Sequence, residues 1–521
     1  MFMQMRWLLL LLMLASMTQA ARILGIFPTP ARSHSRVFEV LMKELASRGH
    51  HVTFVSPIAP QLAPPSNSSS GSFNHIFLEG SEELLSGMDQ IIGPDRSPLK
   101  ETIGLWHVAP KLCEKQLASK ELQPLLRDKS IEFDLVIVEV FFFDCMIPFA
   151  RHFNAPLVGF VSFWTPPWGH AMVANPYNLA ISPNFFLPYV DKMNYFERLH
   201  NVLHTTFTVT LRQWLFLPHQ DAVARRYFGD NTPPIAELEL DTSLFLSNTH
   251  PAMHFPFARV PSMIEVGGIH ILPAKALPKD LAKFLDESRK GVVIFSLGSM
   301  INNDNLPPER LQLLTKTMAA LPYPVIWRWD TIDVPGLTPN VRVEKWMPQR
   351  DMLAHPNVRL LVTHGGLLSA LEAATEGVPR LVLPFFGDQH MNALKAVQDG
   401  VALSLEFYTA SPEQLINASM RLLSEPSFRE AAMRLSKLVV DQPEKPLERA
   451  VFWTEYVLRH NGAHHLQSAA KQLSWHQLHL LDVFAVVLAV LISTFLVLRA
   501  LVRLICCAKH QSPVVKKKKV Q

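Results

Sequence analysis

Cysteine is scarce in this chain, with only four among 521 residues. These four residues have neither the spacing of a zinc site nor the pattern of a disulfide framework. The chain also lacks an Asp-x-Asp pair, and its first turn, from Gly25 to His34, lacks the G-x-G-x-x-G pattern of dinucleotide-binding proteins. We therefore expect no metal site and no resident cofactor, and a dinucleotide oxidoreductase is disfavoured.

Acidic residues are absent from the end of the chain, after a long apolar run at residues 483–498. Seven basic residues follow this run. A buried core helix is the alternative, but the basic flank favours a transmembrane helix at 480–505 with a cytosolic tail at 506–521. The preceding body then lies on the opposite, luminal side of the membrane.

The two ends of the chain carry targeting features. Residues 1–20 combine a basic residue, an apolar core and a small-residue cleavage site, which predicts a signal peptide. The last four residues, 518–521, resemble the dilysine retrieval signal of type I proteins of the endoplasmic reticulum membrane. We expect a single-pass protein of that membrane with a luminal body, in which Asn67 and Asn417 are glycosylation sequons.

The net charge does not indicate a nucleic-acid partner. The formal charge is +4, but eight basic residues lie in the leader and the tail, so the intervening body is net negative. A basic patch of the kind that binds phosphate backbones is therefore not expected. The sequence does not indicate an oligomeric state.

The luminal body repeats a strand–helix–strand pattern. A strand at 22–27, a helix at 37–47 and a strand at 52–55 open the chain, and the pattern restarts after Gly291. This predicts an α/β protein with two doubly wound parallel-sheet domains that face a cleft, at 21–270 and 271–470. Residues 164–225, rich in proline and aromatic residues, fit the pattern poorly and are predicted to pack on the membrane or line a pocket.

One strand-to-helix junction has the chemistry of an anion site. The sequence VTHGGLLSALE places His364 and two glycines, including Gly366, where an apolar strand gives way to a helix. A helix N-terminus favours a phosphate, and glycines let it approach the backbone. Ser369 adds a hydroxyl, and Glu372 lies further along the helix, within reach of a ribose.

Further polar and aromatic residues surround this junction in the sequence. Trp346 offers a flat indole to a nucleobase, and Gln349 follows it. The segment 295–299, which ends at Ser299, closes the first strand of the same domain with small residues. Asp388 and Gln389 end the following strand with a carboxylate and an amide suited to sugar hydroxyls.

Together, these segments resemble the UDP-glycosyltransferase family, and most closely its insect branch. The similarity is carried by the signature at 346–392, by FSLGS at 295–299, VGGIH at 266–270 and ERAVFW at 448–453, and by the apolar segment with its dilysine end. The resemblance implies a GT-B type fold and transfer of a sugar from a UDP-sugar to a small acceptor.

Carried over onto this sequence, the resemblance assigns roles to the donor-site residues. Trp346 would stack on uracil, and Gln349 would lie near the base and ribose. Some members carry asparagine where this chain has Leu368, so backbone or Ser369 would replace that contact to the diphosphate. The remaining assignments place the diphosphate at His364, Gly366 and Ser369, the ribose at Glu372, and the transferred sugar at Asp388 and Gln389.

The acceptor hydroxyl needs a base, and histidine suits that task. His34 follows the first strand and also matches the base of the family. A carboxylate has to orient it, by the logic of serine hydrolases. Glu139 ends a strand, and Asp144 has the residue type of the family but lies five residues later. We favour Asp144, with Glu139 close behind.

The expected reaction is an inverting transfer of a hexose to a hydroxyl of a small lipophilic acceptor, with His34 as general base. UDP-glucose is the preferred donor, and UDP-glucuronate is second. The alternative is a catalytically silent, membrane-tethered binder or a modulator of related transferases. The presence of His34 with a nearby carboxylate favours the enzyme over the silent binder. A detoxifying role is the hypothesis for such an enzyme.

Overall fold

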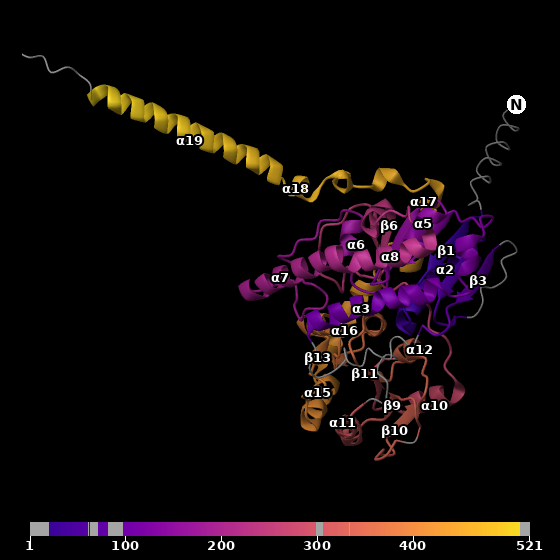
Figure 1. The fold of residues 1–521 in the computed structure, drawn as a ribbon. Helices are drawn as coiled ribbons and strands as arrows, with labels where there is room; N and C mark the ends of the chain where they lie inside the picture. The colour runs from indigo at the N-terminus through magenta and orange to yellow at the C-terminus, as the bar shows by residue number, and fades with distance from the viewer. Residues whose placement is uncertain are drawn as a thin grey trace, which may run out of the picture. The chain divides into compact units, whose positions relative to one another are not determined.

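The computed structural model describes residues 20–60, 62, 71–81, 97–298, 306–332 and 334–510, with side chains up to Cys506. Four sequence predictions lie outside the described residues: the signal peptide, the Asn67 sequon, Ser299 and the dilysine end. The chain divides into two units, Met1–Gln467 and Ser468–Gln521. The first unit holds both sheets (Figure 1).

Within the described residues, the first sheet has seven parallel strands in the order β3-β2-β1-β4-β5-β6-β7. Its central strands are buried over their whole length, and they are apolar apart from Glu139 at the end of one of them, as expected when helices cover both faces. Alternate residues of β4 enter different core clusters, because successive side chains point to opposite faces. The strands are β1 (Arg22–Ile26), β2 (His51–Ser56), β3 (Ser72–Phe77), β4 (Leu135–Glu139), β5 (Leu157–Val161), β6 (Thr242–Ser247) and β7 (Met263–Glu265).

The part of the second sheet that the structure describes has six parallel strands in the order β10-β9-β8-β11-β12-β13. Together the two sheets confirm the predicted pair of doubly wound α/β domains. In each sheet the strand order reverses once, between β1 and β4 and between β8 and β11, and ligands of such sheets bind outside the carboxyl ends at this point. The strands are β8 (Val292–Ser296), β9 (Val325–Arg328), β10 (Val341–Glu344), β11 (Val358–Thr363), β12 (Arg380–Val382) and β13 (Ala402–Ser404).

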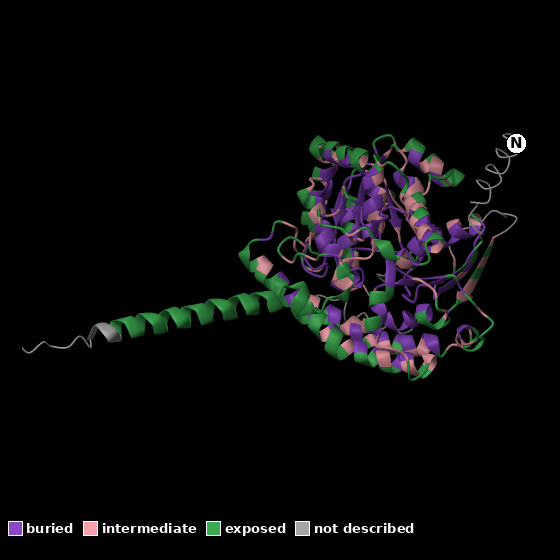
Figure 2. Cartoon of the chain, turned by 90° about the horizontal axis from the view of Figure 1, so that it is seen from above, coloured by how far each residue is buried: buried purple, intermediate pink, exposed green. Residues whose placement is uncertain are grey.

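Helices connect the strands and cover the sheets, with the buried residues concentrated in the strands and inner helix faces (Figure 2). In the first half they are α2 (Arg32–Ser47), α3 (Pro98–Leu117), α4 (Gln123–Arg127), α5 (Pro148–His152), α6 (Pro167–Met172), α7 (Tyr195–Leu211), α8 (Leu217–Phe228) and α9 (Ile235–Leu238). In the second half they are α10 (Lys279–Glu287), α11 (Pro308–Ala320), α12 (Gln349–Leu353), α13 (Leu367–Thr375), α14 (Gln389–Gln398), α15 (Pro412–Ser424) and α16 (Pro426–Val440).

The segment that fitted the pattern poorly is a helical excursion between β5 and β6. It contains α6, α7, the π-helical turn η3 (Arg212–Phe216) and α8. Phe185 and Phe186 of this segment line a large cavity, as one of the two sequence-based alternatives predicted.

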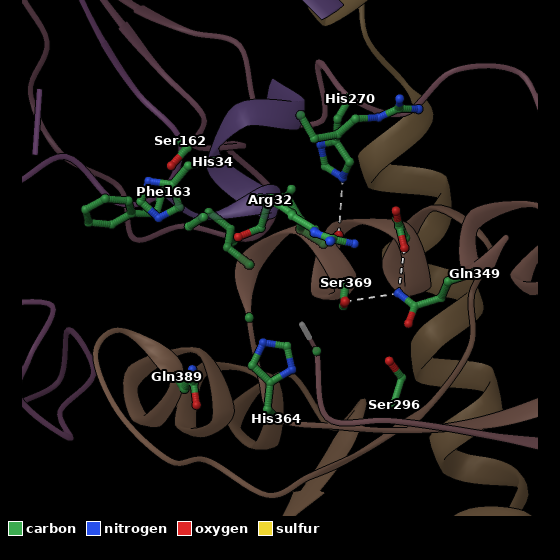
Figure 3. Close-up of a pocket in the computed structure, with 18 of the residues that line it drawn as sticks. Arg32, His34, Ser162, Phe163, His270, Ser296, Gln349, His364, Ser369 and Gln389 are labelled. Atoms are coloured by element: carbon green, nitrogen blue, oxygen red, sulfur yellow. Dashed lines mark hydrogen bonds between the residues drawn. The ribbon is translucent and has the colours of Figure 1, made fainter. Parts of the chain in front are cut away.

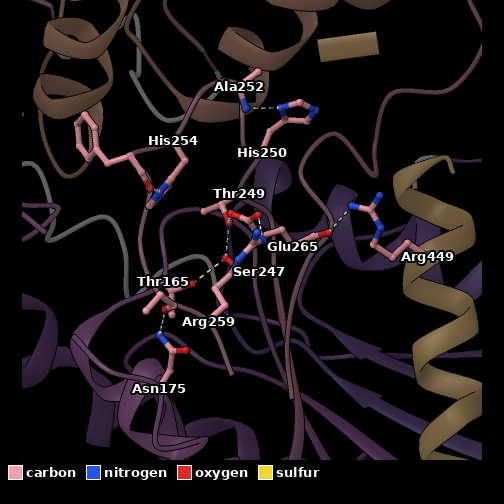
Figure 4. Close-up of polar contacts among 12 residues, drawn as sticks. Thr165, Asn175, Ser247, Thr249, His250, Ala252, His254, Arg259, Glu265 and Arg449 are labelled. Atoms are coloured by element: carbon pink, nitrogen blue, oxygen red, sulfur yellow. Dashed lines mark hydrogen bonds and ion pairs between the residues drawn. The ribbon is translucent and has the colours of Figure 1, made fainter. Parts of the chain in front are cut away.

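After α16 the chain returns to the first half of the molecule. Helix α17 (Pro446–Arg459) contributes Ala450 and Val451 to the core cluster of α2 and the first sheet. The Arg449 guanidinium donates to the carbonyl oxygen of Glu265 at 3.1 Å, beside a chain of hydrogen bonds through Thr249 and Ser247 (Figure 4). The last helix of the body therefore packs on the first sheet, although it follows the second in sequence.

The second unit contains α18 (Trp475–Leu478) and the long helix α19 (Leu481–His510). Over Leu481–Cys506 this helix is apolar and exposed, and it is the one helix among the described residues that is long and apolar enough to cross a membrane. Its 26 residues correspond to about 39 Å, more than the ~30 Å hydrocarbon core. This agrees with the predicted membrane helix.

One disulfide bond joins Cys113 of α3 to Cys145, with 6.2 Å between the Cα atoms. The sequence predicted no disulfide framework, and this bond corrects that reading. The two cysteines are separated by 32 residues, a spacing that carries no disulfide signal of its own. The bond ties α3 to the short helix η2 (Asp144–Met146) that follows β4.

Candidate active site

A cavity of about 530 Å³ lies between the two halves and is lined by loops that follow the strands of both sheets. Figure 3 shows His34 and Phe163 together on one side and Gln349 with Ser369 on the other. The structure therefore brings together residues far apart in sequence. The sequence-predicted residues that line it are His34, Trp346, Gln349, His364, Gly366, Ser369, Glu372, Asp388 and Gln389.

His34 lies in the first turn of α2 and contacts a buried carboxylate. Its Nδ1 is 2.6 Å from Oε1 of Glu139, the last residue of β4. Because an ionised carboxylate only accepts hydrogen bonds, Nδ1 is the nitrogen that donates to it, and in the neutral imidazole Nε2 then keeps its lone pair. The backbone N–H of Thr29 donates to Oε2 of Glu139 at 3.2 Å and fixes the carboxylate. The imidazole is thus held in the tautomer that accepts a proton at Nε2.

Asp144, which we favoured as the partner of His34, lies elsewhere. Its carboxylate is 3.0 Å from the Arg212 guanidinium and accepts a hydrogen bond from Gln220 at 3.4 Å. Burial raises the pKa of Asp144, while the charge of Arg212 acts in the opposite direction. Arg212 also pairs with Glu239. The preference for Asp144 over Glu139 is corrected: Asp144 belongs to a buried ion-pair cluster behind the loop, and Glu139 contacts the histidine.

The turn between β11 and α13 holds His364 against glycine backbone. A Cβ on Gly366 would lie 2.5 Å from the Nε2 of His364, and one on Gly298 would lie 2.6 Å from its Cε1. Burial lowers the pKa of His364 to about 4, so the imidazole is neutral at neutral pH. Helix α13 begins without a side-chain cap at Gly366. Its first N–H groups and the imidazole can therefore serve an anion.

Three predicted donor-site residues form one hydrogen-bonded group. The Gln349 amide donates to the Ser369 hydroxyl at 3.0 Å and to the Glu372 carboxylate at 2.7 Å. Burial raises the pKa of Glu372, an effect that the Gln349 hydrogen bond and the nearby Arg350 partly offset. Trp346 is 60% exposed at the cavity, so one indole face is available for stacking.

Asp388 and Gln389 lie where the two halves meet. Burial raises the pKa of Asp388 to about 6, against the opposing effects of the Asn392 hydrogen bond and of His34 across the cavity. Gln389 accepts hydrogen bonds at Oε1 from the backbone of Phe385 at 2.8 Å and Phe386 at 3.3 Å, so its Nε2 is the donor that remains. A carboxylate and an amide donor of this kind suit vicinal hydroxyl groups.

The part of the cavity around His34 is apolar. The imidazole lies 5.3 Å from the Phe141 ring and 5.7 Å from the Phe163 ring, centre to centre. Phe143, Phe185 and Phe186 extend this lining. An apolar molecule with one hydroxyl group fits this chemistry, because the rings surround a small polar group made by the His34 imidazole and the Ser162 side chain.

Sequence reasoning missed several residues at this site. Thr29 fixes Glu139 through its backbone, and Glu101 of α3 accepts a hydrogen bond from the backbone of Gly387 at 2.9 Å. Trp164 donates to Asn392 at 2.5 Å across the two halves. The contacts of Glu101 and Trp164 span more than 200 residues, so no local pattern could have indicated them. Among the described residues, no group of three His, Cys, Asp or Glu side chains could hold a metal ion.

Comparison with known proteins gives relatives that match over nearly the whole chain. UDP-glycosyltransferase UGT5 of Dactylopius coccus is 35% identical over 482 residues, which cover 91% of this chain and 90% of that protein. Human UDP-glucuronosyltransferase 2B15 is 34% identical and covers 89% of each chain. The crystal structure of TcCGT1 in complex with UDP superposes with a TM-score of 0.57 at 17% identity, covering 85% of this chain and 100% of that one.

The solved structure establishes the two-domain GT-B type fold, and the sequence relatives establish the family. The family model described as UDP-glucoronosyl and UDP-glucosyl transferase matches residues 24–521. The cleft supports the same conclusion, since the uncapped N-terminus of α13 and the exposed indole of Trp346 line the same cavity as His34 and its phenylalanine neighbours. The chain belongs to the UDP-glucoronosyl and UDP-glucosyl transferase family and is a UDP-glycosyltransferase that binds a UDP-sugar donor.

Proposed function

We propose that this enzyme transfers glucose from UDP-glucose to a hydroxyl group of a small lipophilic acceptor, with inversion at the anomeric carbon. The observation that carries the proposal is the 2.6 Å contact between His34 and Glu139 at the cavity. In this scheme His34 is the general base, and Glu139 holds its tautomer and stabilises the imidazolium that forms.

The proposed reaction is a single displacement. The acceptor hydroxyl gives its proton to Nε2 of His34 while its oxygen forms a bond to the anomeric carbon. The bond from that carbon to the β-phosphate oxygen breaks, and the electron pair leaves with UDP. The N-terminus of α13 and the N–H of His364 stabilise the charge on the diphosphate. A UDP-α-sugar therefore gives a β-glycoside.

In the proposal, polar and aromatic side chains of the second half bind the UDP-sugar donor. Trp346 stacks on uracil, Glu372 with Gln349 binds the ribose, and the diphosphate lies at His364, Gly366 and Ser369. The remaining predicted contacts, from Asp388 and Gln389, hold the transferred sugar. In this division, residues 21–270 bind the acceptor and residues 271–470 bind the donor.

Charge supports glucose over glucuronate as the transferred sugar. The segment proposed to hold the sugar already contains the Asp388 carboxylate, and the Glu101 carboxylate contacts its backbone at Gly387. A glucuronate carboxylate placed next to these two groups would meet like charges in a partly desolvated site. The cations that line the same cavity, such as Arg32 and Arg328, lie outside this segment. A neutral hexose meets only hydrogen-bond partners.

The proposed acceptor class rests on the apolar lining of the cavity, and the proposed location of the enzyme rests on its membrane helix. Phenylalanines surround the base, which supports small phenols and lipophilic alcohols as acceptors. Such molecules partition into membranes, where a tethered enzyme meets them. We further propose that the enzyme lies in the endoplasmic reticulum membrane with a luminal, glycosylated body, and that it clears such molecules.

The test is transfer to a panel of phenols by microsomes that contain the full-length protein, with UDP-glucose or UDP-glucuronate as donor. The expected result is a β-glucoside by NMR, with UDP-glucose preferred at least tenfold. His34→Ala should abolish transfer. His51→Ala is the matched control, because His51 is an exposed histidine of the first half that does not line the cavity.

Several outcomes would contradict the proposal. An α-glycoside product would exclude the single displacement. Preference for UDP-glucuronate would overturn the charge argument on the sugar. Full activity of a folded His34→Ala variant would show that His34 is not the general base.

A further inference from the structure

One side chain of the donor half, Asn392, connects three segments through its amide. Its Nδ2 donates to the carbonyl oxygen of Gly365 and to Oδ2 of Asp388, both at 2.9 Å. Its Oδ1 accepts from the indole N–H of Trp164 at 2.5 Å. An amide has one acceptor oxygen and one nitrogen with two N–H donors in a fixed plane, so the three bonds define its orientation. Asn392 is buried, with 6% of its surface exposed.

The indole that contacts Asn392 belongs to the other half of the molecule and is itself fixed. Trp164 follows β5 and comes directly after Phe163, which lines the cavity. The Trp164 ring lies against the His254 ring at 3.7 Å and the Phe255 ring at 5.3 Å, centre to centre. Burial lowers the pKa of His254 to about 3, so this neighbour is neutral. The indole N–H therefore has one stable direction, toward Asn392.

A second contact from the first half reaches the same segment. The Gly387 N–H donates to Oε2 of Glu101 in α3 at 2.9 Å. Glu101 is buried. Side chains of the first half thus contact both ends of the segment 387–392, and Asp388 and Gln389 lie between these two contacts.

We propose that Trp164 is a positioning residue for the donor, which acts through Asn392 to hold Asp388 and the Gly365 turn in place for the UDP-sugar. The acceptor half then contributes to donor affinity without touching the donor. This inference rests on the proposed role of Asp388 at the transferred sugar. It adds a contact across the two halves that determines how well that residue is placed.

The test uses full-length enzyme in microsomes. KM for UDP-glucose is measured at saturating phenol, and KM for the phenol is measured at saturating UDP-glucose. Trp164→Phe keeps a ring and removes the N–H. We expect it to raise KM for the UDP-sugar roughly fivefold, the effect of one lost hydrogen bond, while KM for the phenol stays within about twofold. Asn392→Ala loses all three bonds and should raise the donor KM by roughly tenfold or more.

The matched control is Trp168→Phe. Trp168 is a second buried tryptophan of the same half, and its indole nitrogen has no hydrogen-bond partner among the described residues. Its replacement should leave the donor KM unchanged. In the double variant of Trp164 and Asn392, the donor KM should equal that of Asn392→Ala alone, because the two residues act through one bond.

Two outcomes would overturn the inference. One is a donor KM for Trp164→Phe equal to that of Trp168→Phe, and the other is effects of Trp164→Phe and Asn392→Ala that multiply in the double variant. If Trp164→Phe does not fold, Asn392→Asp tests the second link of the inference, from Asn392 to Asp388 and Gly365, since it keeps the acceptor oxygen for the indole and removes both donors. An unchanged donor KM in that variant also overturns the inference.

Asp388→Ala, measured in the same assay, separates this inference from the proposed function. A raised donor KM in Asp388→Ala with a wild-type value in Trp164→Phe would reject only the contribution of Trp164. An unchanged donor KM in Asp388→Ala would reject the sugar contact itself, and the inference with it.

Discussion

The contact between His34 and Glu139 can be tested by the nearly isosteric change Glu139→Gln. The backbone N–H of Thr29, 3.2 Å from Oε2, requires an oxygen at that position, so the introduced amide nitrogen faces Nδ1 of His34, 2.6 Å from Oε1. Nδ1 then has to accept a hydrogen bond, which moves the imidazole proton to Nε2. This is the tautomer that cannot take a proton from an acceptor hydroxyl.

The size of the effect follows from this tautomer. An Asp-to-Asn change beside the histidine of a serine protease lowers kcat about 10⁴-fold for the same reason. We expect Glu139→Gln to lower kcat by about 10² to 10⁴, which corresponds to roughly 3–5 kcal/mol of transition-state stabilisation. KM for the UDP-sugar should change little, because the Glu139 side chain is only 1% exposed and does not line the cavity.

The control is Asp144→Asn, five residues further along the chain. Asp144 contacts Arg212, which retains Glu239 as its second partner. This change should lower the thermal unfolding midpoint and leave kcat of the folded fraction within a few-fold of wild type. The assay is steady-state transfer to a phenol at saturating UDP-glucose, normalised to folded protein. Wild-type kcat in Glu139→Gln, or loss of kcat in a stably folded Asp144→Asn, would refute the reasoning.

Three further predictions concern the cavity and the disulfide. Gly298→Ala should raise the donor KM at least tenfold in steady-state assays, because its Cβ would lie 2.6 Å from the His364 ring at a positive φ of 81°; an unchanged KM would contradict the role of this packing. Burial raises the pKa of Asp388 to about 6, so kcat/KM for the UDP-sugar should fall as the pH drops through 6 and the carboxylate is protonated. Asp388→Asn should make that fall shallower without abolishing it, because the proposed base His34 must also be unprotonated for transfer; a pH profile identical to that of wild type would assign the whole fall to another group. Cys113→Ser should cost about 3–4 kcal/mol of unfolding free energy, from the 32-residue separation of Cys113 and Cys145, measured by denaturant titration; equal stability with and without reductant in the wild type would contradict this.

Much of the fold could be predicted because the strands are buried on both faces. Such strands appear in the sequence as continuous apolar runs between helical segments, so both parallel sheets were evident. The return of α17 to the first sheet was not, because its core contacts come from Ala450 and Val451, more than 400 residues after the α2 residues that they meet. Local patterns indicate which face of a helix is apolar and do not indicate the sheet that it covers.

The choice between Glu139 and Asp144 shows what residue type alone cannot decide. Strand register decides it: Ile26 of β1 pairs with Val138 of β4, so the carboxyl ends of the two strands lie side by side. Glu139 therefore ends β4 next to the loop that leads to His34. Asp144 lies beyond the next turn, in η2, where the chain has already left the sheet edge. The position at the end of the strand therefore places Glu139 beside His34, although aspartate is the residue type that the family resemblance suggested.

In the proposed reaction, the two partners of the displacement belong to opposite halves of the chain. The reversal between β1 and β4 lies beside the proposed base and the apolar lining, and the reversal between β8 and β11 lies beside the proposed diphosphate site at Gly366. A nucleophile held by one half and a leaving group held by the other meet the sugar from opposite sides. This arrangement supports the proposed inversion. The proposed sugar contacts depend on both halves, because Glu101 and Trp164 of the first half contact the segment 387–392 of the second. Changes to the phenylalanine lining can therefore alter the acceptor without altering the donor, provided that these two contacts are kept.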